Sequence, residues 1–127
     1  MPATAHELSR AGLLAGLPGE RLSELAARMA REEVAPGLAV VREGDDGERF
    51  YVLLSGMLEV TQQSMGRRGV LRPGDHFGEV ALVMGVPRTA TVRAITPATL
   101  ASCDRTTFDE LLRPLFSDAE DDSPVGV

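Results

Sequence analysis

Two charged residues, Glu79 and Arg88, stand in the stretch His76–Val92 (HFGEVALVMGVPRTATV), which otherwise reads as apolar core. A buried charge is costly unless an opposite charge or a hydrogen-bonding group meets it. Two interpretations satisfy this requirement: the two side chains pair with each other inside a barrel, or they bind a ligand. Structural ion pairs are common, so the two residues alone leave both interpretations open.

The residues around Glu79 favour a ligand with an anionic group. Gly78 lets the backbone approach a ligand closely, and residues 79–84 are long enough for one or two helical turns whose first N–H groups lack intrahelical partners. Such N–H groups bind phosphate, and the guanidinium of Arg88 can bind the same oxygens. Glu79 would be repelled by a phosphate unless it accepts protons from hydroxyls. The pair therefore describes a sugar phosphate.

The elements that position these residues are predicted to be mainly β. Between Glu33 and Asp104, short apolar runs alternate with turn residues at spacings near ten residues. This pattern predicts seven or so antiparallel strands in a sandwich or jelly roll. Most glycines, Gly47 among them, fall between these runs and are interpreted as turn residues only.

Helices are predicted on both sides of the strands. A capping box that starts at Thr4 begins a short helix, and apolar spacing predicts a second helix from Pro18 to about Arg31. Asp104 or Thr106 caps a third helix, which Pro114 should kink or end.

Length and composition place the chain among cytoplasmic proteins of one domain. The 127 residues include a single cysteine, Cys103, which excludes an intrachain disulfide and a four-cysteine zinc site. All 13 basic residues are arginines scattered along the chain, not the basic stripe that nucleic-acid binding requires. No apolar run approaches the roughly 20 residues of a membrane helix. We therefore expect neither direct nucleic-acid binding nor membrane insertion.

The domain boundary is expected after Ser117. Residues 1–117 form the globular domain, and residues 118–127 form an acidic mobile tail or linker in which Val125 and Val127 are exposed. His76, at a loop-to-strand boundary, is interpreted as an exposed turn residue rather than a ligand-binding one.

The stretch from Phe77 to Val92 resembles the phosphate-binding cassette of the cyclic nucleotide-binding domain family. The family pattern is Phe-Gly-Glu, a short apolar helix, then Pro-Arg-Ser/Thr/Ala-Ala-Ser/Thr-Val, which matches FGEVAL and PRTATV here. The upstream stretch REGDDGERFYVLLSGMLEV is similar to the family's β-hairpin region. The resemblance covers roughly Leu8 to Leu112 and implies an antiparallel β jelly roll with N-terminal helices, a short cassette helix and one C-terminal helix.

The resemblance also implies a role for each matching residue. Arg88 would pair with the exocyclic phosphate oxygen, and Glu79 would accept the ribose 2′-hydroxyl. The backbone N–H groups that complete the cradle would be those of Gly78, Val80, Ala81 and Ala90. The remaining ligand-binding residues would be Phe77 and Thr89 of the cassette, with Val70 and Leu71 beside the base. Core packing alone also explains Val70 and Leu71.

The implied ligand is a cyclic nucleotide. Thr89 is compatible with both cAMP and cGMP and leaves the choice of purine open, with cAMP the favoured ligand. No metal or other cofactor is expected. After Leu112 the sequence shows no long amphipathic lid and no helix-turn-helix, so the output is expected on a separate effector such as a transporter, enzyme or channel. Two alternatives are a degenerate domain that binds proteins and a cupin-type enzyme. The latter needs clustered histidine and carboxylate ligands, and the chain has only two histidines.

Overall fold

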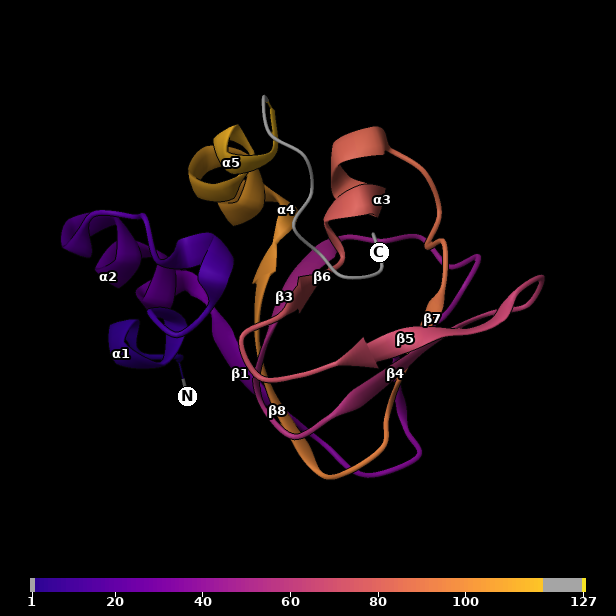
Figure 1. Cartoon of the computed structure of the whole chain (residues 1–127). Coiled ribbons are helices and arrows are strands. Elements are labelled where there is room, and N and C mark those ends of the chain that lie inside the picture. The colour runs from indigo at the N-terminus through magenta and orange to yellow at the C-terminus, as the bar shows by residue number, and fades with distance from the viewer. Residues whose placement is uncertain (1, 118–126) are drawn as a thin grey trace.

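The apolar runs of the middle of the chain form two four-stranded antiparallel sheets, seen face to face in Figure 1. The computed structural model describes residues 2–117 and residue 127. The strand orders are β1-β8-β3-β6 and β2-β7-β4-β5. The strands are β1 (Ala30–Val34), β2 (Ala39–Val41), β3 (Arg49–Ser55), β4 (Leu58–Gln62), β5 (Gly66–Leu71), β6 (His76–Phe77), β7 (Thr91–Ala94) and β8 (Ala98–Asp104). The predicted antiparallel jelly roll with flanking helices is confirmed.

Most helices gather beside the sheet that contains β3 and β8, while α3 lies beyond the end of β6 (Figure 1). They are α1 (Ala5–Leu8), the 3-10 turn η1 (Gly12–Leu14), α2 (Gly19–Arg28), α3 (Glu79–Met84), α4 (Arg105–Thr107), the π-helical turn η2 (Phe108–Leu112) and α5 (Pro114–Ser117). The predicted capping box at Thr4 is present, with its side chain and that of Glu7 each accepting from the other's backbone N–H. No helix within residues 2–117 is long and apolar enough to cross a membrane.

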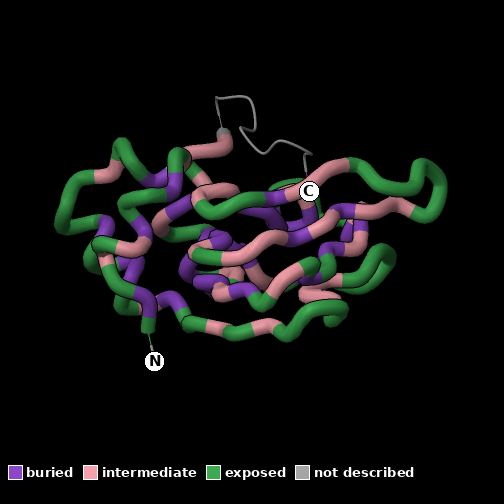
Figure 2. The backbone as a smooth tube through the Cα atoms, turned by 60° about the horizontal axis from the view of Figure 1, so that its bottom comes forward, coloured by how far each residue is buried: buried purple, intermediate pink, exposed green. Residues whose placement is uncertain are grey.

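Strand β3 separates two apolar cores because successive side chains of a strand point to opposite faces. Phe50 and Val52 pack toward the helices, whereas Tyr51 and Leu53 pack between the two sheets. Both faces are therefore buried, which explains the uninterrupted apolar run of this strand. Figure 2 shows the buried segments concentrated along the middle of the molecule, with exposed loops at its ends.

The second helix is shorter than its apolar spacing predicts. The predicted end near Arg31 is wrong: α2 ends at Arg28, and Met29 is extended. From Ala30 onward the chain pairs with β8, beginning with Ala30 opposite Ser102. The ladder with β8 supplies the backbone partners that another helical turn would have supplied, so tertiary pairing overrides the helical pattern.

Helix geometry changes just before Pro114, as predicted. Asp104 caps the start of α4 by accepting a hydrogen bond from the Thr107 N–H at 2.9 Å. The N–H of Arg113 donates to the Phe108 oxygen at 2.7 Å, five residues back, which makes this turn π-helical. Pro114 has no N–H to continue the ladder and instead occupies the first position of α5, where none is needed.

Candidate functional site

Gly78 makes the sharp entry from β6 into α3. Its φ of +100° lies in the left-handed region, which residues with a side chain rarely adopt. A Cβ at this position would stand 2.8 Å from the main-chain oxygen of Arg49 and 3.0 Å from Nη1 of Arg88. Glycine is therefore required here both for backbone conformation and for close packing against the protein itself.

Arg88 lies in the loop before β7 and is 6% exposed. Its guanidinium donates from Nη1 to the Gly78 oxygen at 3.1 Å and from Nη2 to the Arg49 oxygen at 2.8 Å. Its Cζ lies 5.9 Å from the centre of the Tyr51 ring. Two main-chain carbonyls and an aromatic face thus fix the cation at the entrance to α3.

The surroundings of Arg88 weaken its charged form. Burial lowers the pKa of the guanidinium, and the nearby Tyr51, Glu79 and Glu48 partly oppose that shift. The two carbonyl oxygens that accept from the guanidinium offset only part of the solvation that Arg88 loses on burial. An anion arriving at this guanidinium would supply the compensating charge.

Gly47 packs directly against the same guanidinium. A Cβ there would stand 2.7 Å from Cζ and Nε of Arg88 and 2.7 Å from Cβ of Ala81. Its φ is not positive, so turn geometry does not require glycine at this position. The interpretation of Gly47 as a turn residue only is therefore wrong: the residue is small because Arg88 and α3 occupy the space.

Glu79 is the first residue of α3 and is 2% exposed. Its Oε1 lies 3.2 Å from Nε2 of His76. Among the described residues no ion pair joins Glu79 to Arg88 within 4.0 Å. The alternative in which the two charges simply pair with each other is therefore wrong.

His76 is buried, 3% exposed, and belongs to β6. The interpretation of this residue as an exposed turn residue is wrong. Its ring packs against Phe50 and Phe116 with centres 5.8 and 5.7 Å away, and its backbone pairs with Val52 of β3. Strand pairing and aromatic packing draw it inward.

The remaining predicted ligand-binding residues lie around α3 and in the core between the sheets. Ala81 and Ala90 are buried, as are Phe77 and Leu71, whereas Val80, Val70 and Thr89 are half-buried. The ring of Phe77 stacks on Tyr51 with centres 4.9 Å apart. The structure thus brings the cassette residues together, and core packing accounts for Leu71, which has no exposed surface.

The N–H of Gly78 already has an oxygen acceptor. It donates to the main-chain oxygen of Val127 at 3.0 Å. Val127 is 7% exposed and packs in the core between the sheets, so its predicted exposure is wrong. The rest of the predicted tail, including Val125, lies outside the described residues.

A cavity of about 480 Å³ reaches Arg88 from the side of β2 and β3. This is within the size range of small-molecule sites. Of the predicted ligand-binding residues only Arg88 lines it. The other lining residues are Ala39, Val40, Val41, Arg42, Asp45, Asp46, Glu48, Arg49 and Tyr51.

Three of the residues that shape this site were not predicted as site residues. Tyr51 contacts Arg88 and lines the cavity, and the alternation of β3 already requires one of Phe50 and Tyr51 to face between the sheets. The sequence pattern does not predict the roles of Gly47 and of the main-chain oxygen of Arg49. Both roles depend on where the guanidinium of Arg88 lies.

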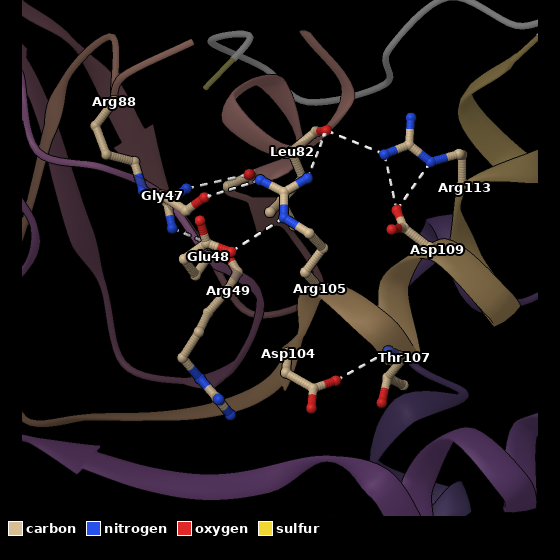
Figure 3. A network of polar contacts seen from close by, with 11 residues as sticks. Gly47, Glu48, Arg49, Leu82, Arg88, Asp104, Arg105, Thr107, Asp109 and Arg113 are labelled. Atoms are coloured by element: carbon tan, nitrogen blue, oxygen red, sulfur yellow. Dashed lines mark hydrogen bonds and ion pairs between the residues drawn. The ribbon is translucent and has the colours of Figure 1, made fainter. Parts of the chain in front are cut away.

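Two C-terminal arginines hold the other end of α3 (Figure 3). Arg113 donates to the Leu82 oxygen at 3.1 Å, and Arg105 donates to the same oxygen at 3.4 Å. Arg105 also pairs with Glu48 at 3.0 Å and contacts the Gly47 oxygen at 3.5 Å. The C-terminal helices are thereby connected to the loop that packs on Arg88.

The comparisons with known proteins agree with this geometry. The family model of the cyclic nucleotide-binding domain matches residues 31–114. The cAMP-dependent protein kinase regulatory subunit of Yarrowia lipolytica is 38% identical over 121 residues, covering 93% of this chain and 32% of that protein. A cGMP-dependent protein kinase of Caenorhabditis briggsae is 34% identical over 114 residues, covering 85% and 15% respectively. The chain thus spans less than a third of either kinase protein.

Solved structures of regulatory subunits superimpose on the chain. The regulatory domain of Toxoplasma gondii PKA with cAMP has a TM-score of 0.83 and 27% identity, over 87% of this chain and 44% of that chain. The regulatory subunit of a cAMP-independent protein kinase A from Trypanosoma brucei has a TM-score of 0.84 and 27% identity, over 87% of this chain and 41% of that chain.

Proposed function

Because the chain belongs to the cyclic nucleotide-binding domain family, we propose that it binds a cyclic nucleotide and regulates an effector outside this chain. The observation that carries the proposal is the arrangement of Arg88 and Glu79. Both are buried at the start of α3, yet they do not pair with each other within 4.0 Å. A ligand with a phosphate and a neighbouring hydroxyl suits both.

The proposed contacts follow the cassette. Arg88 binds an exocyclic phosphate oxygen through the guanidinium that now serves two carbonyls. Glu79 accepts the ribose 2′-hydroxyl. The N–H of Gly78 binds a phosphate oxygen in place of the Val127 oxygen, which supports the proposal because that N–H is already directed at an acceptor. Val80, Ala81 and Ala90 supply further N–H groups.

The next part of the proposal concerns the residues around the base and the choice between cAMP and cGMP. Phe77 and Thr89 would complete the cassette side of the site, and the half-buried Val70 of β5 would contact the base, with Leu71 packing behind it in the core. We propose cAMP as the physiological ligand because relatives such as the Yarrowia subunit are named for cAMP dependence. cGMP is the competing ligand, since a relative is a cGMP-dependent kinase.

We expect the chain to act as a regulator in the cytoplasm without catalysing a reaction itself. The relatives named above include regulatory subunits of protein kinases, which favours an enzyme as effector over a transporter or channel. Binding would be read out by that partner.

Calorimetric titration with cAMP and cGMP tests the proposal. Charge-assisted hydrogen bonds contribute about 1.5–3 kcal/mol each, so Arg88→Ala should weaken binding by roughly 10- to 100-fold. Arg21→Ala, on the exposed face of α2, is the matched control and should leave affinity unchanged. Absence of binding and of any rise in Tm at millimolar nucleotide would contradict the proposal and favour a protein-binding role.

A further inference from the structure

We propose that His76 is a positioning residue that holds the Glu79 carboxylate in place for the ribose 2′-hydroxyl. The inference rests on the proposed function and extends it to a residue outside the cassette pattern. Nε2 of His76 lies 3.2 Å from Oε1 of Glu79, and the two side chains are 4% and 2% exposed. Such burial makes the contact a property of the site rather than of the surface.

The backbone fixes the separation of the two residues. His76 sits in β6 opposite Val52, and Glu79 begins α3 immediately after the left-handed turn at Gly78. A single residue, Gly78, therefore connects a strand held by pairing to a helix held by its packing. The backbone therefore fixes the points from which the two side chains start.

Aromatic packing fixes the imidazole ring. Phe50 from β3 lies 5.8 Å from it, and Phe116 from α5 lies 5.7 Å from it at an interplanar angle of 67°. These two phenylalanines also contact each other and Phe108. A ring confined in this way keeps its Nε2 3.2 Å from one carboxylate oxygen, so an ionic contact rather than an aligned hydrogen bond joins the two groups.

The chemistry of the pair suits a hydroxyl acceptor. A buried carboxylate keeps its charge only where donors or cations surround it, and an imidazole can supply an N–H donor or a positive charge. The two oxygens of a carboxylate offer about four acceptor positions, so a contact at Oε1 is compatible with a ribose hydroxyl on the same group. A carboxylate that is ionised and fixed in direction binds a hydroxyl more tightly than one that rotates.

The experiment measures the affinity ratio of cAMP to 2′-deoxy-cAMP in the wild type and in three variants of the same chain. We expect the wild type to favour cAMP by roughly 10- to 100-fold, the range of a hydrogen bond to a charged group. His76→Phe keeps an aromatic ring without a donor, and His76→Asn keeps a polar group that is shorter. Either of these two variants should reduce the affinity ratio of cAMP to 2′-deoxy-cAMP to about threefold or less. His76→Gln should keep much of the wild-type ratio.

Cys103→Ala is the packing control. Cys103 is buried opposite Phe50 in the same core, so its truncation loosens that core while leaving the imidazole in place. We expect it to lower Tm and to preserve the ratio. His76→Phe is apolar and His76→Asn is polar. If one of these two variants fails to fold, the other still allows the comparison.

The outcomes separate the two proposals. If the wild type discriminates and both His76→Phe and His76→Asn keep the full ratio, His76 serves packing only and the inference is overturned. If the wild type binds neither nucleotide or does not discriminate between them, the Glu79–ribose contact of the proposed function fails and the inference falls with it.

Discussion

Replacing Gly47 by alanine introduces one methyl group against the guanidinium that we propose binds phosphate. The new Cβ would lie 2.7 Å from Cζ and Nε of Arg88 and 2.7 Å from Cβ of Ala81. Carbon atoms pack best at roughly 3.5–4.0 Å. Either the guanidinium or α3 must therefore move by about 1 Å, and the side chain of Arg88 yields more readily than the helix.

A displacement of this size breaks the hydrogen bonds that fix Arg88. The donors now lie 3.1 Å from the Gly78 oxygen and 2.8 Å from the Arg49 oxygen, and about 1 Å more exceeds hydrogen-bond distance. Overpacking of a well-filled site costs about 1–3 kcal/mol. We expect Tm to fall by roughly 5–10 °C and cAMP affinity to fall by about tenfold or more, because the cation no longer faces its ligand.

Thermal melting and calorimetric titration of Gly47→Ala measure the two effects, with Gly19→Ala as the matched control. A Cβ at Gly19 meets nothing within 4 Å, and the position lies in α2, where alanine is favoured over glycine. The control should keep its affinity and its Tm or raise the latter slightly. Wild-type affinity in a folded Gly47→Ala protein would refute the reasoning that Arg88 must hold its observed position to bind.

Two further predictions concern Val127 and Cys103. The main-chain oxygen of Val127 accepts the hydrogen bond of the Gly78 N–H, and the Val127 side chain is buried in the core. Val127→Ala removes about 1.5 kcal/mol of the stabilisation that this burial provides. The apparent affinity for cAMP in a titration should therefore rise by up to about tenfold, because the ligand displaces a weaker competitor; unchanged affinity would show that Val127 does not compete. Burial raises the pKa of the Cys103 thiol in the folded chain to about 12. As the pH rises, the unfolded chain therefore loses the thiol proton near pH 8.5, well before the folded chain does. This contribution to the free energy of unfolding is complete below that pH and is lost as the pH rises toward about 12. Denaturant titrations at several pH values should show a flatter decline for Cys103→Ala, and an identical decline would contradict the shift.

The sequence was informative where a residue's role depends on its near neighbours. The capping box at Thr4 and the break at Pro114 follow from local hydrogen-bonding rules, and both occur. The turn at Gly78 followed by a short helix is equally local. These features need no knowledge of what packs on them.

The errors arose where distant segments decide the outcome. Arg31 continues a helical pattern, but β8 pairs with this stretch and makes it a strand. His76 resembles a loop residue until Phe50 and Phe116 enclose it. The small size of Gly47 is explained by α3 and by the path of the Arg88 side chain, 41 positions further along the chain. Periodicity and turn chemistry carry no information about such contacts.

The polar contacts of α3 give a physical reason for binding to be felt beyond the site. At its start, the Gly78 oxygen accepts from Arg88, and near its end the Leu82 oxygen accepts from Arg105 and Arg113 of the C-terminal helices. A phosphate that draws the Arg88 guanidinium toward itself weakens the first contact, since a donor hydrogen bonded to an anion is less available to a carbonyl. The helix can then shift only by straining or breaking the second set of contacts. Because one helix carries both, we expect ligand charge at its start and the position of the C-terminal segment at its end to be energetically coupled.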